Sequence, residues 1–380
     1  MKRLVLVGGG HSHVEVLRQF GVRPAVGAEI TLVSPARHTS YSGMLPGFIA
    51  GHYSYRDCHI DLAYLARFAG ARLVQSSARN IDTPRHQIVL TDGTALDYDV
   101  VSIDIGAASA RAAMGGAADD AIAVKPVEEF LPAWNALVER AQRGELKKIL
   151  VVGGGAGGVE LLLAMQHHID RLAAPRGVEF QLVTDRDRLL PDLNPGTRTA
   201  FQRILSHRGI GVRLNCRVVR AQANAAITAN GERIAADAVI RATGAGAPSW
   251  LRETTLKLDA AGFIATDEHL QSLSHPELFA TGDCATIAGY AYPKSGVYAV
   301  RQGPILARNL RDALANHRLG TYRPQRRALA LISTGDKYAV ASYGGLTMQG
   351  AWVWHWKNRI DRRFMARYAD PALRPELLVR

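Results

Sequence analysis

The sequence has few cysteines. Its 380 residues include only Cys58, Cys216 and Cys284, which lie far apart and form no C-x-x-C motif. This spacing argues against a cysteine-based zinc site and against a disulfide framework. It also argues against a redox-active cysteine pair as the electron carrier, and it fits a protein of the reducing cytoplasm.

Long apolar runs are missing too. Because no eighteen consecutive residues are apolar, we expect no transmembrane helix. The apolar residues 4–7 lead directly into three glycines, which predicts a first β-strand rather than a signal peptide. Acidic residues are outnumbered, 34 against 46 basic ones, and the net charge of +12 predicts an anionic partner such as a phosphorylated cofactor or anionic lipid. No zinc-finger spacing or basic tail supports nucleic acid as that partner.

A glycine motif near the middle of the chain is the strongest positive signal. Residues 149–152 predict a buried parallel strand, and Gly153, Gly155 and Gly158 follow with G-x-G-x-x-G spacing ahead of an apolar helix. In this dinucleotide fingerprint the first glycine allows the turn, the second lets a pyrophosphate approach, and the third lets helix and strand pack closely. The pyrophosphate would bind at the positive N-terminal end of the helix.

The chain opens with a second, weaker copy of this motif. Gly8 and Gly10 match the first two positions, but His13 stands at the third, and we expect the close helix–strand contact to be lost there. His11 and His13 lack a nearby third ligand, so we expect a polar helix start and no metal site. Two nucleotide sites in one chain predict electron transfer between two nucleotides.

The strand that follows each fingerprint ends in a hydroxyl residue. Ser34 and Thr184 stand where an acid usually binds a ribose hydroxyl, and both can still form a hydrogen bond. Nearby Arg186 and Arg188 can accept a 2′-phosphate or be solvated loop charges, so the choice between NADH and NADPH stays open. The other expected elements are a loop at 41–47, a β-meander or hairpin at 73–96, a strand at 99–103, a linker at 107–123, a helix at 128–143 and short strands within 212–242.

Two segments after residue 275 carry further chemistry. Residues 279–283 predict a strand ending in Gly282 and Asp283, where the acid can accept hydrogen bonds from sugar-like hydroxyls, although Gly-Asp is also a common turn. A segment containing Lys294 then leads into a helix at 297–310. The positive N-terminus of that helix can stabilise the anion of a reduced flavin ring.

The last helix has aromatic and basic residues at regular spacing. From Trp352 onward, apolar residues stand four apart and basic residues fill other positions. Such a helix can lie in a membrane interface, or it can dock on the protein's own core while its arginines extend to solvent. The apolar stripe consists of Trp352, Trp356, Ile360, Phe364 and Tyr368.

Taken together, these motifs resemble the flavoproteins with two dinucleotide-binding domains. The carriers are VLVGGGHSH, TSYSGMLPG, VVGGGAGGVE, FATGDCA, YPKSGVYAVRQG and WKNRIDRRFM. Within that class the chain is similar to the type II NADH dehydrogenases, and to the pyridine-nucleotide oxidoreductases found fused to or beside selenophosphate synthetase. The resemblance implies an α/β fold with two Rossmann-like domains. An FAD domain would comprise 1–110 and 245–330, an NAD(P) domain 111–244 would be inserted in it, and a C-terminal amphipathic helical region would cover 331–380.

The resemblance also assigns residues. It implies that FAD binds the first unit and NAD(P)H the second, with Glu160 near the nicotinamide and Lys294 and Gln302 lining the flavin and quinone pocket. These three are the candidate catalytic residues. The candidate cofactor-binding residues are Gly8, Gly10, His11, Ser34, Ser42, Ala78, Gly106, Gly153, Gly155, Gly158, Thr184, Gly244, Gly282, Asp283 and Lys294.

The implied activity is a two-step reaction. NAD(P)H would reduce the flavin, and the flavin would reduce a quinone at the cytoplasmic face of a membrane that Trp352, Trp356 and Phe364 contact. Two alternatives stay open: a soluble reductase with a protein, selenium or sulfur acceptor, and a nucleotide sensor without turnover. A homodimer is also left open.

Overall fold

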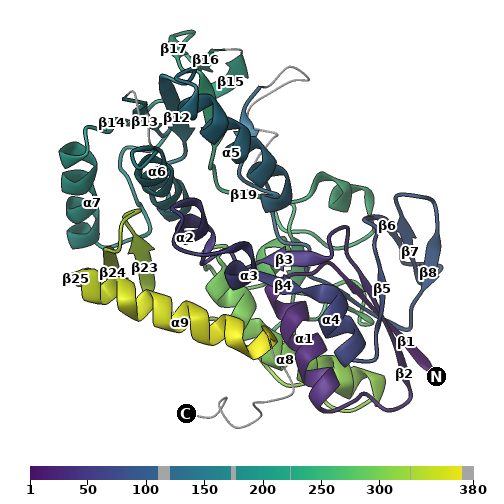
Figure 1. Ribbon diagram of the computed structural model, residues 1–380. Helices are drawn as coiled ribbons and strands as arrows, with labels where there is room; N and C mark the ends of the chain where they lie inside the picture. The colour runs from purple at the N-terminus through teal and green to yellow at the C-terminus, as the bar shows by residue number, and fades with distance from the viewer. Residues whose placement is uncertain (110–119, 173–176, 223, 326, 370–380) are drawn as a thin grey trace.

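The computed structural model describes residues 1–109, 120–172, 177–222, 224–325 and 327–369. Two parallel sheets, each with its own helices, lie side by side, and a long C-terminal helix runs along both (Figure 1). Of the linker expected at 107–123, residues 110–119 lie outside the described part of the chain.

The first parallel sheet has the strand order β21-β9-β1-β2-β5. Leu4 and Leu6 of β1 pack into one apolar cluster, and the alternate residues Val5 and Val7 pack into another. Both faces of the sheet are therefore covered, as is usual for a parallel sheet. Its strands are β1 (Lys2–Val7), β2 (Ala28–Val33), β5 (Arg72–Val74), β9 (Val100–Ile103) and β21 (Leu278–Ala280); its helices are α1 (His11–Val22), α4 (Leu62–Phe68) and α8 (Gly296–Leu314).

The second parallel sheet has the order β11-β18-β12-β13-β14. All of its strands fall between β9 and β21 in the sequence, so the second unit is inserted in the first. Its strands are β11 (Ile122–Ala123), β12 (Lys148–Val152), β13 (Glu179–Val183), β14 (Gly211–Arg213) and β18 (Ala238–Arg241); its helices are α5 (Val127–Gln142), α6 (Ala156–Ile169) and α7 (Pro195–His207).

Smaller elements connect the sheets. Each unit carries a three-stranded antiparallel sheet, and that of the first unit shows that the segment predicted as a meander or hairpin is a meander. The sheets consist of β6 (Ala78–Asp82), β7 (Gln87–Leu90) and β8 (Ala95–Asp97), and of β15 (Val218–Gln222), β16 (Ala225–Thr228) and β17 (Arg233–Ala235). The short strand pairs are β3 (His38–Ser40) with β4 (His59–Asp61), β10 (Ala108–Ser109) with β19 (Ala245–Gly246), and β20 (Ile264–Thr266) with β22 (Ala285–Ile287); the 3-10 turns are η2 (Ser249–Glu253) and η3 (Gly282–Cys284).

The segment 41–47 is not wholly a loop. Helix α2 (Leu45–Ile49) begins within it and is followed by α3 (Tyr55–Cys58). Pro46 occupies the first turn of α2, where the missing backbone N–H costs no helical hydrogen bond. The prediction of a loop therefore holds only up to Met44.

The C-terminal region is a hairpin sheet and one helix. It contains β23 (Ala330–Ser333), β24 (Ala339–Tyr343), β25 (Leu346–Gly350) and α9 (Ala351–Ala369). Trp352, Trp356 and Ile360 are exposed on α9, whereas Phe364 and Tyr368 are buried. The prediction that Phe364 contacts a membrane is therefore wrong, because its ring stacks on Tyr41 with 4.3 Å between centroids.

The predicted fold class is confirmed: the chain is α/β, with two Rossmann-like units and a C-terminal helical region. The exact domain boundaries at 110, 244 and 330 stay predictions. Among the described residues, no helix is both long and apolar enough to cross a membrane.

Candidate functional site

The fingerprint of the second unit has the geometry that its glycines predict. Gly153 has φ +132°, and a Cβ there would lie 2.4 Å from the carbonyl oxygen of Ala242. A Cβ on Gly158 would lie 2.1 Å from the carbonyl oxygen of Gly153, so helix and strand touch at this point. Gly155 precedes α6 and faces open space. A pyrophosphate can approach the N–H groups of α6 there.

The fingerprint of the first unit closes in another way. Gly8 has φ +97°, and a Cβ there would lie 2.3 Å from the carbonyl oxygen of Asp104. At the third position, the His13 ring is fully buried; Nδ1 lies 2.7 Å from the Gly8 carbonyl oxygen and Nε2 lies 2.8 Å from Ser102 Oγ. The predicted loss of helix–strand contact is therefore wrong, because the imidazole bridges the two elements. Burial lowers the pKa of His13 to about 4, so the ring is neutral at pH 7.

The side chain of Asp104 belongs to none of the predicted site residues. It is 2 % exposed, and its Oδ2 accepts hydrogen bonds from the N–H groups of Ser12 at 2.8 Å and His13 at 3.2 Å. Burial raises the pKa of this carboxyl to about 7. The only sequence signal was that an acid stands at the end of a buried strand, in the segment Asp104-Ile105-Gly106.

The predicted segment around Asp283 is held by one buried hydrogen bond and one ion pair. Gly282 has φ +69°, and its N–H donates to Gln302 Oε1 at 2.7 Å. The Asp283 carboxylate pairs with Lys125 of the second unit at 3.1 Å. Gln302 is therefore engaged with the turn itself, and its contact with a flavin or quinone oxygen stays a prediction.

Lys294 lies beside this turn. Its Nζ donates to the carbonyl oxygen of Ala285 and, at 2.7 Å, to Thr286 Oγ1, and it lies 4.1 Å from the ring centroid of Phe263. Burial lowers the pKa of the Lys294 ammonium. These contacts hold the side chain against β22, and a role in flavin or quinone binding stays a prediction.

His11 begins helix α1 and faces the start of α8. Its Nε2 is buried and has no hydrogen-bond partner among the described residues. A Cβ on Gly296 would lie 3.2 Å from Ser42 Oγ and 3.8 Å from His11 Cε1. The predicted cofactor-binding residues His11 and Ser42 therefore both lie close to the first residue of α8. The hydroxyl of Thr281, before the Gly282 turn, is likewise buried without a partner. Unpartnered polar atoms of this kind fit a bound polar group such as a flavin nucleotide.

The remaining predicted residues follow strands of the two parallel sheets, except Ala78, which lies in the antiparallel sheet of the first unit. Ser34 follows β2 and Thr184 follows β13; both are buried, and Ser34 Oγ donates to the carbonyl oxygen of Ala36 at 3.0 Å. Gly106 and Gly244 follow β9 and β18, and Ala78 begins β6. Their contact with a cofactor stays a prediction.

A group of charged side chains joins the two units and α9. Glu160, on α6, accepts hydrogen bonds from the N–H and the hydroxyl of Ser333, both at 2.8 Å. Lys357, on α9, is buried and donates to Asp361 Oδ2 at 2.8 Å and to the carbonyl oxygen of Gly43 at 2.5 Å. Lys357 and Asp361 were missed because the sequence shows only a basic helix there, and nothing in the spacing marks them as buried.

The charges in this group influence one another. Burial raises the pKa of Glu160, while Lys357 and the Ser333 donors oppose that rise. Burial lowers the pKa of Lys357, but the carboxylates of Glu160 and Asp361 outweigh burial and raise it. Tyr41 interacts with Asp361, and burial raises the pKa of its hydroxyl. Lys357 is thus a buried cation between Glu160 of the second unit and Asp361 of its own helix.

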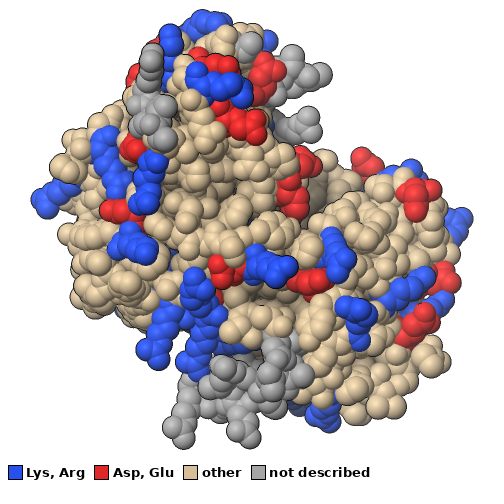
Figure 2. Space-filling view, viewed as in Figure 1, with Lys and Arg blue, Asp and Glu red and all other residues tan. Residues whose placement is uncertain are grey.

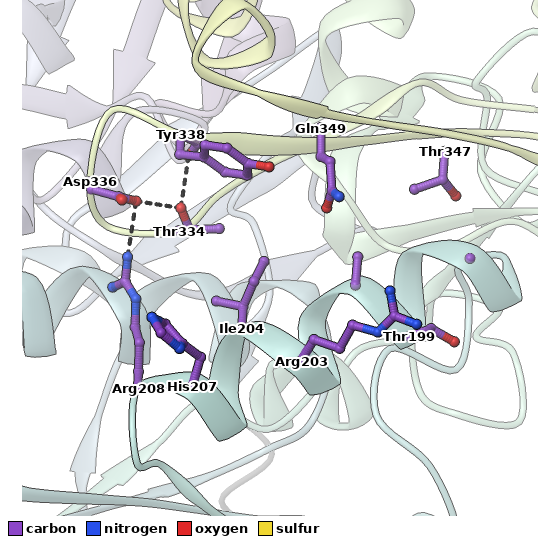
Figure 3. Close-up of a pocket in the computed structure, with 12 residues that line it drawn as sticks. Thr199, Arg203, Ile204, His207, Arg208, Thr334, Asp336, Tyr338, Thr347 and Gln349 are labelled. Atoms are coloured by element: carbon purple, nitrogen blue, oxygen red, sulfur yellow. Dashed lines mark hydrogen bonds and ion pairs between the residues drawn. The ribbon is translucent and has the colours of Figure 1, made fainter.

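A pocket of about 650 Å³ lies elsewhere, between α7 and the β23–β25 sheet. Figure 3 shows Arg203 and His207 on α7 beneath Tyr338 and Gln349, and Arg208 pairs with Asp336 at 3.0 Å. None of the predicted site residues lines it. The candidate site therefore comprises the two fingerprints and the buried charges Glu160, Lys357 and Asp361, which we call the Lys357 group.

Comparison with known proteins places the chain in a family. Residues 2–303 match the model described as pyridine nucleotide-disulphide oxidoreductase. The chain belongs to this family. Its three cysteines, Cys58, Cys216 and Cys284, all lie in the described part of the chain, and all three are free and buried. The protein is an NAD(P)H-dependent flavin oxidoreductase whose cofactors are FAD and NAD(P)H.

Individual relatives are distant but match over most of their length. The type II NADH:quinone oxidoreductase of Haemophilus influenzae is 25 % identical, over 92 % of this chain and 90 % of that protein. The sulfide:quinone oxidoreductase of Aquifex aeolicus superposes with TM-score 0.80 at 16 % identity, covering 99 % of this chain and 93 % of that one. NDH2 from Plasmodium falciparum, in complex with NADH, superposes with TM-score 0.74 at 14 % identity over the whole of both chains. The resemblance to type II NADH dehydrogenases is thereby confirmed, while the link to selenophosphate synthetase stays a prediction.

Proposed function

We propose that this protein passes electrons from NAD(P)H to a quinone at a membrane surface. The observation that carries the proposal is the meeting of three parts of the chain at Lys357. This lysine donates to Gly43 of the first unit, pairs with Asp361 on its own helix and interacts with Glu160 on the fingerprint helix of the second unit. The FAD-binding unit, the NAD(P)-binding unit and the C-terminal helix are thus connected at one buried charge group.

The chain's own residues would perform binding, orientation and proton holding. FAD supplies the redox chemistry when bound. Gly155 and the start of α6 would bind the NAD(P)H pyrophosphate, and Gly10 and the start of α1 that of FAD. Glu160 would position the nicotinamide or hold a proton near it. Asp361 would keep Lys357 positively charged. That charge would stabilise the negative charge that a reduced flavin ring or a quinone oxygen gains.

The C-terminal helix supports an acceptor that is dissolved in a membrane. Trp352, Trp356 and Ile360 are exposed together on α9, and Leu346 of the adjacent hairpin is 66 % exposed. Figure 2 shows basic side chains gathered at the lower left of this face, where Figure 1 places α9. Exposed apolar and aromatic side chains beside basic ones suit the interface of an anionic membrane. The type II NADH:quinone oxidoreductase of H. influenzae gives the acceptor by analogy.

The visible spectrum of the purified protein tests this proposal. The flavin absorption should bleach on anaerobic addition of NADH or NADPH and return when a soluble quinone is added. A flavin that bleaches but is not reoxidised by quinone would show that the acceptor is a protein, selenium or sulfur compound instead. A flavin that no nicotinamide reduces would contradict the donor half of the proposal and favour a nucleotide sensor.

A further inference from the structure

Asp104 in the first unit and Ala242 in the second stand at equivalent positions beside the two fingerprints. The N–H of Asp104 donates to the Val7 carbonyl oxygen at 2.8 Å, and that of Ala242 donates to the Val152 carbonyl oxygen at 2.9 Å. In both units the carbonyl oxygen of this residue lies against the first fingerprint glycine. The same backbone site therefore carries a carboxylate in one unit and a methyl group in the other.

The carboxylate of Asp104 occupies the start of α1. It accepts hydrogen bonds from the backbone N–H groups of Ser12 and His13. N–H groups in the first turn of the helix are the donors that bind a pyrophosphate in a dinucleotide fingerprint. A Cβ on Gly10 would lie 2.2 Å from its Cγ, and a Cβ on Gly282 would lie 2.5 Å from its Oδ1. The carboxylate thus lies between the two glycine turns that form the phosphate side of the first unit.

We propose that FAD binds the first unit together with one proton, which Asp104 takes up. The reaction combines the protein with an ionised Asp104, FAD and one proton, and it gives a complex with a neutral carboxylic acid. A pyrophosphate and an ionised carboxylate at one helix start repel each other in a buried, weakly screened environment. A neutral Asp104 can keep one oxygen as acceptor for Ser12 and donate its O–H to a phosphate oxygen.

The surrounding groups leave the proton to Asp104. Burial raises its pKa to about 7, the His13 and Ser12 donors oppose that rise, and Asp283 adds to it. Burial lowers the pKa values of His11 and His13 to about 4, so neither ring supplies a positive charge at pH 7. Lys125 is paired with Asp283 at 3.1 Å, and Gln302 on α8 is uncharged. Burial raises the pKa of the Cys284 thiol to about 12, and the Asp104 carboxylate adds to that rise, so the thiol stays neutral at pH 7. Within the described part of the chain, Asp104 has no ion-pair partner.

FAD affinity as a function of pH tests the inference, which rests on FAD occupying the first unit. FAD is titrated into the apoprotein between pH 6 and 8.5 by fluorescence quenching, and by calorimetry in two buffers of different ionisation enthalpy. The wild type should lose up to about tenfold in affinity per pH unit above about 7, and proton uptake should approach one per FAD at the alkaline end. Asp104→Ala, which copies Ala242, and Asp104→Asn should both bind FAD with little pH dependence and more tightly than the wild type at pH 8.5.

The control is Asp92→Asn, a change in the exposed turn between β7 and β8 that should keep the wild-type pH dependence. If the wild type binds FAD with constant affinity across this pH range and takes up no proton, the inference about Asp104 is wrong. The proposed function is not affected by that result. Retention of the pH dependence in both Asp104 variants would likewise overturn the inference, because another group would then titrate. Absence of FAD binding at every pH would overturn both this inference and the proposed function. If Asp104→Ala does not fold, two measurements still test the inference: calorimetry of the wild type in the two buffers, and the pH dependence of FAD binding to Asp104→Asn.

Discussion

His13 and Gly158 stand at the same position of the two fingerprints and meet the same packing requirement differently. Gly158 lets α6 touch the Gly153 carbonyl oxygen, whereas the His13 ring spans the corresponding gap and bonds to Gly8 and Ser102. The sequence predicted a weaker nucleotide unit because it reports only that glycine is absent. The complementary partner, Ser102 on β9, lies 89 residues away in the sequence and could not be paired with His13 from spacing alone.

The neutral His13 makes the folded state sensitive to acid. Its pKa falls from the ordinary 6.5 to about 4 in the folded protein, so the unfolded chain takes up the proton first as pH falls. Stability is therefore lost between about pH 6.5 and pH 4. We expect the stability advantage of the wild type over His13→Gln to shrink by about 2–3 kcal/mol across this range. Urea unfolding of both proteins at several pH values measures it, and a constant difference would contradict a neutral, bridging imidazole.

Glu160 and Lys357 should affect turnover rather than FAD binding. Glu160→Gln removes a carboxylate whose buried partners are Ser333 and Lys357, and we expect kcat to fall about a hundredfold, within the range of general acid–base groups. Lys357→Met leaves Asp361 buried without its cation and should both slow turnover and lower stability. Steady-state kinetics and the flavin-to-protein absorbance ratio separate the two effects. Unchanged kcat in Glu160→Gln would remove this residue from the mechanism.

At the scale of elements, α9 shows what periodicity can and cannot predict. The sequence predicted a helix with one apolar stripe, and the helix is confirmed. The stripe is divided along its length, because Trp352, Trp356 and Ile360 face solvent whereas Phe364 and Tyr368 pack on the first unit. Residues four apart drift around an α-helix, and the surface they meet changes along nineteen residues. Only the packing partners decide which part is exposed.

The exposed part of α9 should determine membrane binding. Trp352→Ala combined with Trp356→Ala removes two stacked rings that contact no other described ring, so folding should be unaffected while liposome binding weakens at least tenfold. Co-sedimentation with vesicles with and without anionic lipid measures it. The matched control is Leu273→Ala, which changes an exposed apolar residue elsewhere and should leave binding unchanged. Equal binding by the double variant and the wild type would contradict the interface proposal.

Across the whole molecule, both strand–turn–helix units were predictable because each motif is local. Strand, glycine turn and helix stand within about twenty residues, and the order of elements repeats in both units. The contacts that assemble the site are long-range, such as Lys357 with Gly43, Asp283 with Lys125, and Tyr368 with Glu15. No pattern in one sequence pairs residues so far apart. The catalytic candidates could therefore be named from motifs, but their partners could not.

The C-terminal helix holds the two units together, so its removal should do more than release the protein from membranes. The Tyr368 hydroxyl donates to buried Glu15 of α1 at 3.0 Å, and Trp354 packs on the hairpin sheet beside the second unit. Five apolar or aromatic side chains of α9 are buried, namely Val353, Trp354, Phe364, Met365 and Tyr368.

At about 1.5–3 kcal/mol for each buried side chain, their loss is comparable to the total stability of an ordinary domain. Deletion of residues 351–380 should therefore lower the thermal midpoint by more than 10 °C and expose apolar surface that binds a hydrophobic dye, even without lipid. Circular dichroism melts and dye fluorescence measure this against the Trp352 and Trp356 double variant, which should match the wild type. A truncated protein that melts normally would show that α9 is dispensable for the fold and serves the membrane alone.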